Sequence, residues 1–349
     1  GAPVSAQTTD DGAFAEAELA RFGSTLAVGG GQVFVGESNT QIRPGAVFVY
    51  EKQGSNWIEV QELNAPEAEW GDGFGAAVTV SGGNLFVAGS GGVHTFSRSG
   101  GTWSYQSTIG VEAPTAMAVQ DGYAIIAEAG ANDNAGTAHL FRLDAGSWSH
   151  AAMVEPESLM ANDRFGASVA FQGDMAVVGA PGANNRAGTA YLFRMSMDGI
   201  EMSGQLDAGQ ERNDGFGSSV MMDGDVTAVG APLSGGIGAV YAFFQDENGE
   251  WDNVRYTAFD GEMARGRNPG TRFGTSMATS GNLKMAGSRT GVYVFDILDG
   301  GMVQGVAKWD GGELADGGFG SAMAASGDLI AIAAPTTSGG IGTLSLIHI

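Results

Sequence analysis

The chain contains no cysteine among its 349 residues, so it has no disulfide, no thiolate metal site and no cysteine nucleophile. Lysine is nearly absent, and acidic residues outnumber Lys and Arg by 39 to 16, which gives a formal net charge of -23. Phosphate backbones and anionic lipids repel such a chain, so we expect no nucleic-acid partner. No apolar run approaches the roughly 18 residues that span a bilayer, so we also expect no membrane insertion.

Sequence signatures of catalysis and of metal binding are missing as well. The chain has four His residues, no two of them at metal-ligand spacing. Nucleophile elbows, Walker loops and His-Glu-x-x-His motifs are absent. His94 and His139 fall at a strand position that aromatic residues fill elsewhere in the chain, which favours packing over ligation. We therefore expect no catalytic residue, no metal and no cofactor.

An internal repeat dominates what is present. Phe-Gly pairs begin at Phe22, Phe74, Phe165, Phe216, Phe273 and Phe319. Ala113-Pro114 takes the same place in a degenerate unit, so seven units start near residues 22, 74, 113, 165, 216, 273 and 319. A repeat of about 50 residues is typical of β-propellers, in which each repeat forms one blade.

Each unit predicts four short strands. In the fourth unit these are Phe165–Phe171, Met175–Gly179 and Gly188–Arg194, followed by an outer strand after the next turn. Alternating apolar residues and tight Gly/Asp turns predict antiparallel hairpins. The expected fold is all-β, a seven-bladed propeller of four-stranded antiparallel blades. Four tryptophans open the outer strand of their units, and this regular phase favours packing over sugar binding: Trp57, Trp103, Trp148 and Trp251.

The pattern resembles a known repeat. Phe165-Gly166, Val178-Gly179-Ala180-Pro181 and Gly188–Phe193 are similar to the FG-GAP repeat of integrin-α-like propellers, and the resemblance runs from about residue 22 to 343. It implies seven blades and a role in adhesion or recognition outside cells. The calcium loops of integrin-type repeats do not carry over, because the turns between the first two strands are too short to wrap a cation that needs six to eight oxygen ligands.

The two ends suggest where the domain begins and stops. Residues 1–10 form an N-terminal segment in which Val4-Ser5-Ala6 fits the end of a signal peptide, although a frayed acidic terminus fits as well. Residues 11–343 are expected to form one propeller, with Phe14–Leu19 as the strand that closes the last blade. Residues 344–349 depart from the strand pattern and match the translation of a transposon adaptor end, which predicts a non-native tail on a longer protein. The alternative is a natural apolar strand.

Candidate binding residues lie in two kinds of loop. The loops between the second and third strands differ from unit to unit, as recognition loops on a rigid scaffold do; they supply Asn39, Arg43, Asn132, Asp133, Asn134, Asn184, Asn185 and Arg186. Three carboxylates stand two residues before a Phe in the loops that join blades: Asp72, Asp163 and Asp214. They form either part of a ligand site or caps on their own turns, and their regular position favours caps.

These observations favour a non-catalytic recognition or adhesion module. We expect it to be secreted, at the cell surface or periplasmic, to bind an extracellular protein or glycan, and to be a monomeric domain. One alternative is a propeller lyase or hydrolase with an axial carboxylate and Arg site, which the small residues of the predicted inner strands argue against. The other alternative is a purely structural spacer.

Overall fold

The computed structural model describes residues 4–5, 22–38, 43–196, 199–209, 213–245, 251–256, 271–298, 302–337 and 342–348. The strands form seven antiparallel sheets, six of consecutive strands and one that adds β1 to β26, β27 and β28, and the fold is an all-β, seven-bladed propeller, as the repeat predicts. The chain divides into two compact units. None of the helices in the described part of the chain is long and apolar enough to cross a bilayer.

Unit 1 comprises residues 1–114, 289–291 and 310–349. Its first blade consists of β2 (Thr25–Gly29), β3 (Gln32–Glu37), β4 (Ala46–Gln53) and β5 (Asn56–Leu63). The second blade consists of β6 (Val78–Ser81), β7 (Asn84–Gly89), β8 (Gly92–Ser99) and β9 (Thr102–Ile109). The last blade has β26 (Ala322–Ser326), β27 (Leu329–Ala334) and β28 (Thr343–His348), preceded by the short helix η4 (Gly312–Gly317).

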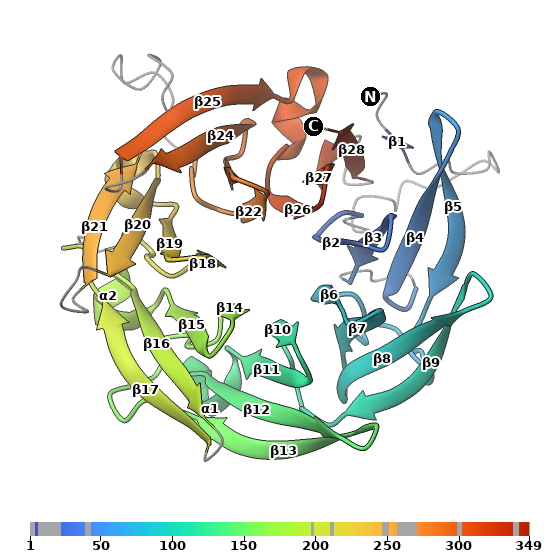
Figure 1. Cartoon of the computed structure of the whole chain (residues 1–349), viewed down its shortest axis with the longest axis horizontal. Helices are drawn as coiled ribbons and strands as arrows, with labels where there is room; N and C mark the ends of the chain where they lie inside the picture. The colour runs from blue at the N-terminus through green and yellow to red at the C-terminus, as the bar shows by residue number, and fades with distance from the viewer. Residues whose placement is uncertain are drawn as a thin grey trace. The chain divides into compact units, whose positions relative to one another are not determined.

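Unit 2 comprises residues 115–288 and 292–309. Its four blades each have four strands, drawn from green to orange in Figure 1. The strands are β10 (Ala116–Gln120), β11 (Tyr123–Glu128), β12 (Thr137–Asp144) and β13 (Ser147–Val154); β14 (Ser168–Gln172), β15 (Met175–Ala180), β16 (Thr189–Ser196) and β17 (Gly199–Leu206); β18 (Ser219–Asp223), β19 (Val226–Ala231), β20 (Ala239–Gln245) and β21 (Trp251–Tyr256); β22 (Met277–Ser280), β23 (Leu283–Gly287), β24 (Gly291–Leu298) and β25 (Met302–Asp310). The first strands of neighbouring blades contact one another, β10 with β14 and β14 with β18.

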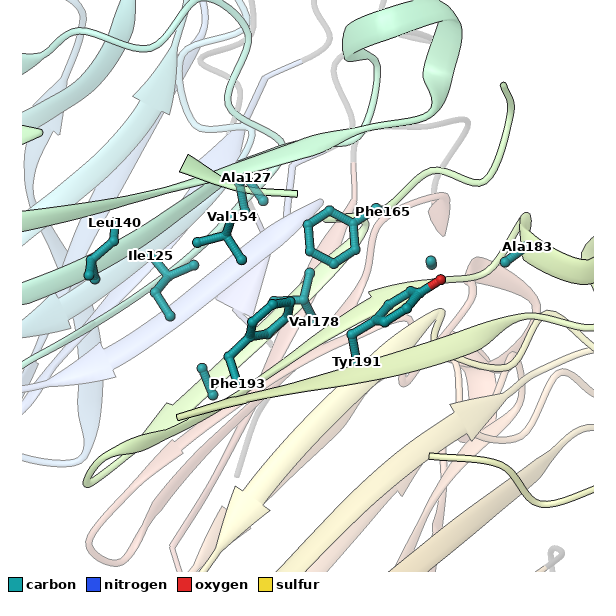
Figure 2. Close-up of a cluster of buried hydrophobic side chains, with 12 residues drawn as sticks. Ile125, Ala127, Leu140, Val154, Phe165, Val178, Ala183, Tyr191 and Phe193 are labelled. Atoms are coloured by element: carbon teal, nitrogen blue, oxygen red, sulfur yellow. The ribbon is translucent and has the colours of Figure 1, made fainter. Parts of the chain in front are cut away.

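The repeated Phe fills the space between neighbouring blades. Phe165 is fully buried, and its ring meets those of Tyr191 and Phe193 edge-on at centroid distances of 5.6 and 6.0 Å. Figure 2 shows the same ring beside Ala127 and Val154 of the preceding blade. One aromatic side chain therefore joins two sheets, which explains why a Phe recurs at this position in six of the seven units.

The Phe-Gly pair lies before the first strand of its blade and not inside it. We predicted a strand starting at Phe165, but β14 starts at Ser168, and Phe165 forms an isolated parallel bridge with Gly136 of the preceding blade. A Cβ on Gly136 would lie 2.0 Å from the Phe165 carbonyl oxygen, so only glycine allows this approach. The pair is thus a link between blades.

Segments near both ends of the chain contribute to the last blade, in unit 1. Phe22 packs with Ala331 and Leu344, which joins the first blade to the last. The predicted closing strand, 14–19, lies outside the described residues. Among those described, β1 (Val4–Ser5) pairs antiparallel with β28. The predicted non-native tail begins within β28, where Leu344 and Leu346 are buried, so its apolar alternation fits a third strand; its origin remains a hypothesis for the nucleotide sequence to test.

Candidate functional site

Two of the predicted binding loops share one backbone conformation. They are the short turns α1 (Ala131–Asn134) and α2 (Ala183–Arg186), both in unit 2. Three consecutive residues of each turn have positive φ, between 52° and 66°: Asn132, Asp133 and Asn134 in α1, and Asn184, Asn185 and Arg186 in α2. Asn and Asp tolerate this left-handed conformation better than most residues, which accounts for their presence.

The left-handed conformation of these turns directs backbone carbonyl groups toward the next blade. The carbonyl of Asn134 accepts a hydrogen bond from the Arg164 amide at 2.8 Å, and the carbonyl of Arg186 accepts one from the Gly215 amide at 2.9 Å. Asn132 also donates to Glu155 at 2.9 Å, and Asn184 donates to Thr189 at 3.0 Å. All six turn residues are exposed. Their part in ligand binding stays a prediction, whereas their part in linking blades is visible.

The remaining loop candidates lie in unit 1. Arg43 makes an ion pair with the buried Glu37, and its guanidinium lies 5.4 Å from the centre of the Phe48 ring. Burial raises the pKa of Glu37, and the charge of Arg43 opposes that rise. Asn39 lies outside the described residues. Arg43 thus has a structural partner whether or not it also meets a ligand.

The three carboxylates before the Phe residues are all buried. Asp72 Oδ1 accepts hydrogen bonds from the amides of Gly45 at 2.9 Å and Phe74 at 3.0 Å. Asp163 Oδ2 accepts one from the Met160 amide at 2.8 Å. Asp72 and Asp163 therefore cap turns, which was the favoured interpretation, and Asp214 is buried at the equivalent position.

Asp72 also lines a cleft in unit 1, which we call the Trp70 cleft. Its volume is about 580 Å³, and it lies between the loop that joins the first two blades and strands β8 and β9 of the second blade. Its lining residues are Ala65, Pro66, Glu67, Glu69, Trp70, Gly71, Asp72, Ser90, Gly91, His94, Tyr105 and Thr108. Trp70 is 74% exposed, more than any other large hydrophobic residue in the described part of the chain. A cleft of this size falls in the range typical of small-ligand sites.

Trp70 is held in place by its own backbone. It forms an antiparallel bridge with Pro44, at the point where the first blade's third strand is about to begin. The Asp72 cap fixes the same loop two residues later. The exposed indole is therefore presented by a loop with defined backbone contacts.

A polar network forms one wall of the cleft. His94 Nδ1 lies 3.0 Å from the Thr108 hydroxyl, which lies 2.9 Å from the Tyr105 hydroxyl. His94 is only 6% exposed, and its Nε2 has no hydrogen-bond partner in the protein. Burial lowers the pKa of His94, opposed in part by the Ser90 backbone and the Asp72 carboxylate. The exposed Tyr105 and Thr108 hydroxyls of this network line the cleft and can hydrogen-bond a polar group of a ligand, while His94 supports them from the buried side.

Sequence reasoning found the kind of loop but missed most of these residues. Of the lining residues it named Asp72 as a site candidate, and it assigned His94 to packing. His94 does pack on Phe74, with ring centroids 5.6 Å apart. Trp70 was recognisable in principle, because it is a tryptophan outside the regular outer-strand position. Trp103, which holds that position, is buried and donates its indole N–H to Gln32 at 2.9 Å, so packing is the correct interpretation for it.

Comparison with known protein families finds one match to the repeat. Residues 148–193 match the family model of the FG-GAP repeat. The chain contains an FG-GAP repeat. The match includes Phe165-Gly166 and Gly179-Ala180-Pro181, the residues that carried the resemblance in the sequence. It confirms the recognition of the repeat and the propeller to which it belongs.

Solved structures confirm the fold of this FG-GAP propeller. It is similar to the computationally designed protein Ika8, with a TM-score of 0.54, 13% identity and coverage of 95% of this chain and 97% of that one. It is also similar to a protein from Lactobacillus plantarum, with a TM-score of 0.60, 10% identity and coverage of 82% and 84%. At such identities the likeness concerns the fold alone. No curated protein sequence matches the chain significantly.

Proposed function

We propose that this FG-GAP propeller is a non-catalytic recognition module that works outside the cell and binds a carbohydrate in the Trp70 cleft. The observation that carries the proposal is the exposed Trp70 indole at a cleft that also contains hydroxyl and carboxylate groups. The C–H face of a sugar ring stacks on the electron-rich face of an aromatic ring, and its hydroxyls need hydrogen-bond partners. The cleft offers both.

The shape of the surface favours a glycan over a protein ligand. A stable protein interface buries roughly 800 Å² on each partner around a cluster of large apolar side chains. Among the described residues of unit 1, the exposed large hydrophobics outside the cleft are Ile58 and Val60 on β5. A concave site with two aromatic rings suits a sugar chain better than a flat interface.

The negative charge at the cleft indicates which class of glycan can bind. Glu67 and Glu69 are exposed at its rim, and the whole chain carries a net charge of -23. Their carboxylates accept hydrogen bonds from sugar hydroxyls and repel acidic polysaccharides. We therefore propose a neutral or amino-sugar glycan as the ligand.

The proposal is tested by binding the purified chain to an array of neutral, amino-sugar and acidic glycans. Trp70→Ala is expected to weaken binding to the selected glycan at least about tenfold, because a central aromatic contact typically contributes 2 kcal/mol or more. The matched control is Ile58→Ala, which removes an exposed apolar side chain of the same unit, 42% exposed, away from the cleft, and should bind like the unchanged protein.

Several results would overturn the proposal. Binding that survives Trp70→Ala would place the ligand elsewhere. Binding to a protein partner with no glycan signal would favour a different recognition function, and no binding at all would favour the spacer. Recovery of cleaved glycan, seen by mass spectrometry, would show an enzyme; recovery of intact glycan supports non-catalytic recognition.

A further inference from the structure

Three polar side chains form a row across the first blade of unit 2. Glu128 lies on β11, His139 on β12 and His150 on β13. His139 Nε2 lies 3.0 Å from Glu128 Oε2, and His139 Nδ1 lies 3.2 Å from His150 Nε2. The two rings are tilted by 59° with their centres 5.4 Å apart. Both nitrogens of His139 are thus engaged, one by a carboxylate and one by another imidazole.

Strand register brings the two histidines together. His139 pairs with Met153 and Phe141 pairs with His150, and the register shifts between Leu140 and Phe141. His150 is therefore a diagonal neighbour of His139 across a β-bulge, within the distance at which long side chains interact. A spacing of eleven residues along the chain does not show this, which is why sequence analysis found no ligand pair.

Glu128 fixes the proton of His139. A carboxylate only accepts hydrogen bonds, so His139 Nε2 carries the hydrogen that Glu128 receives. In the neutral ring, Nδ1 then presents its lone pair toward His150. Metal-binding histidines are commonly oriented by a carboxylate on the other ring nitrogen in this manner.

The separation of the two nitrogens suits one metal ion. Two Zn–N bonds of about 2.05 Å at a near-tetrahedral angle place their nitrogens roughly 3.3 Å apart, against 3.2 Å for the pair here. His150 is exposed, so solvent reaches the site. The His139 side chain is 16% exposed and anchored by Glu128.

We propose that His139 Nδ1 and His150 Nε2 form a binding site for a divalent transition metal of the Zn²⁺ or Cu²⁺ type, with Glu128 as the residue that orients His139. Imidazole nitrogens suit these ions. The described residues hold no group of three or more His, Asp or Glu side chains placed to bind a metal. The protein therefore supplies two ligands, and water completes the coordination. On binding, His150 Nε2 offers its lone pair to the metal, so the His150 proton lies on Nδ1.

The experiment titrates the full chain with ZnSO₄ by isothermal titration calorimetry. One equivalent should bind, and His150→Gln and His139→Gln should each weaken binding at least about tenfold. Glu128→Gln keeps a hydrogen-bond acceptor without the charge and should weaken binding about 10-fold, at the lower end of the range for such orienting residues. His348→Gln removes a histidine from unit 1 and should leave the titration unchanged.

A second measurement identifies the ligands directly. With Cu²⁺ in place of Zn²⁺, electron paramagnetic resonance should show coupling to two imidazole nitrogens in the unchanged protein and to fewer in His150→Gln. Because His150 is exposed, that variant should keep the native circular dichroism spectrum. Equal Zn²⁺ binding by the unchanged protein and folded His150→Gln, or the absence of imidazole coupling, would overturn the proposal.

Discussion

Replacement of Asp72 separates the two roles that the sequence left open, cap and ligand. Asp72 Oδ1 accepts two buried backbone hydrogen bonds, at 2.9 and 3.0 Å, and Oδ2 accepts a longer one from Glu69 at 3.4 Å. A hydrogen bond to a charged group contributes about 1.5–3 kcal/mol, so the two short ones together contribute about 3–6 kcal/mol. In Asp72→Ala, water from the cleft can reach the Gly45 and Phe74 amides that lose their acceptor. We therefore expect this variant to lower the free energy of unfolding by about 3 kcal/mol, the lower end of that range.

Asp72→Asn is the matched control. Its side-chain oxygen still accepts both short bonds without the charge, so the free energy of unfolding should fall by only about 1–2 kcal/mol, in line with the weaker bonds of neutral acceptors. The measurement is urea unfolding followed by circular dichroism and by tryptophan fluorescence, whose agreement checks for a single transition. A loss below about 1 kcal/mol for Asp72→Ala, or equal losses for both variants, would refute the capping role.

Three further predictions concern the scaffold and the cleft. Phe165→Ala should lower the free energy of unfolding by about 4 kcal/mol, and the half-buried Phe171→Ala by less than half as much, in the same urea assay. Gly188→Ala should cost at least about 3 kcal/mol, since its Cβ would lie 2.0 Å from a backbone oxygen of the next blade, whereas Gly173→Ala, also at positive φ but in open space, should cost about 1–2 kcal/mol. Burial lowers the pKa of His94 below its usual 6.5, so the unfolded chain binds more protons as the pH falls through 6.5. The unchanged protein should therefore lose stability relative to His94→Gln between pH 7 and 5, and an opposite slope would contradict the assignment.

The repeat could be predicted because its causes are local in the sequence. A Phe recurs at this position in six units because its side chain fills the contact between neighbouring blades, as that of Phe165 does. Gly166 follows Phe165 because a Cβ there would lie 2.6 Å from the Ala127 Cβ. Only the placement of the pair was wrong, since periodicity does not distinguish the first residue of a strand from a link that precedes it.

The candidate sites were predicted less well, because their residues come together through strand pairing. Trp70, His94 and Tyr105 are separated in sequence and share the cleft through the packing of a loop on the second blade. His139 contacts His150 across a β-bulge, which the spacing of residues along the sequence does not predict. Asp72, by contrast, was found because its cap repeats with the blades.

By itself the sequence determined the number of blades, their boundaries and the residues that join them, because each blade must repeat the same short-range contacts to pack against its neighbours. Only the tertiary structure decided which side chains outside the repeat pattern lie on the same surface. Loops and bulges obey no period, and the distance between two side chains across a sheet depends on register and not on their separation along the chain. The Trp70 cleft and the His139–His150 pair exist for that reason.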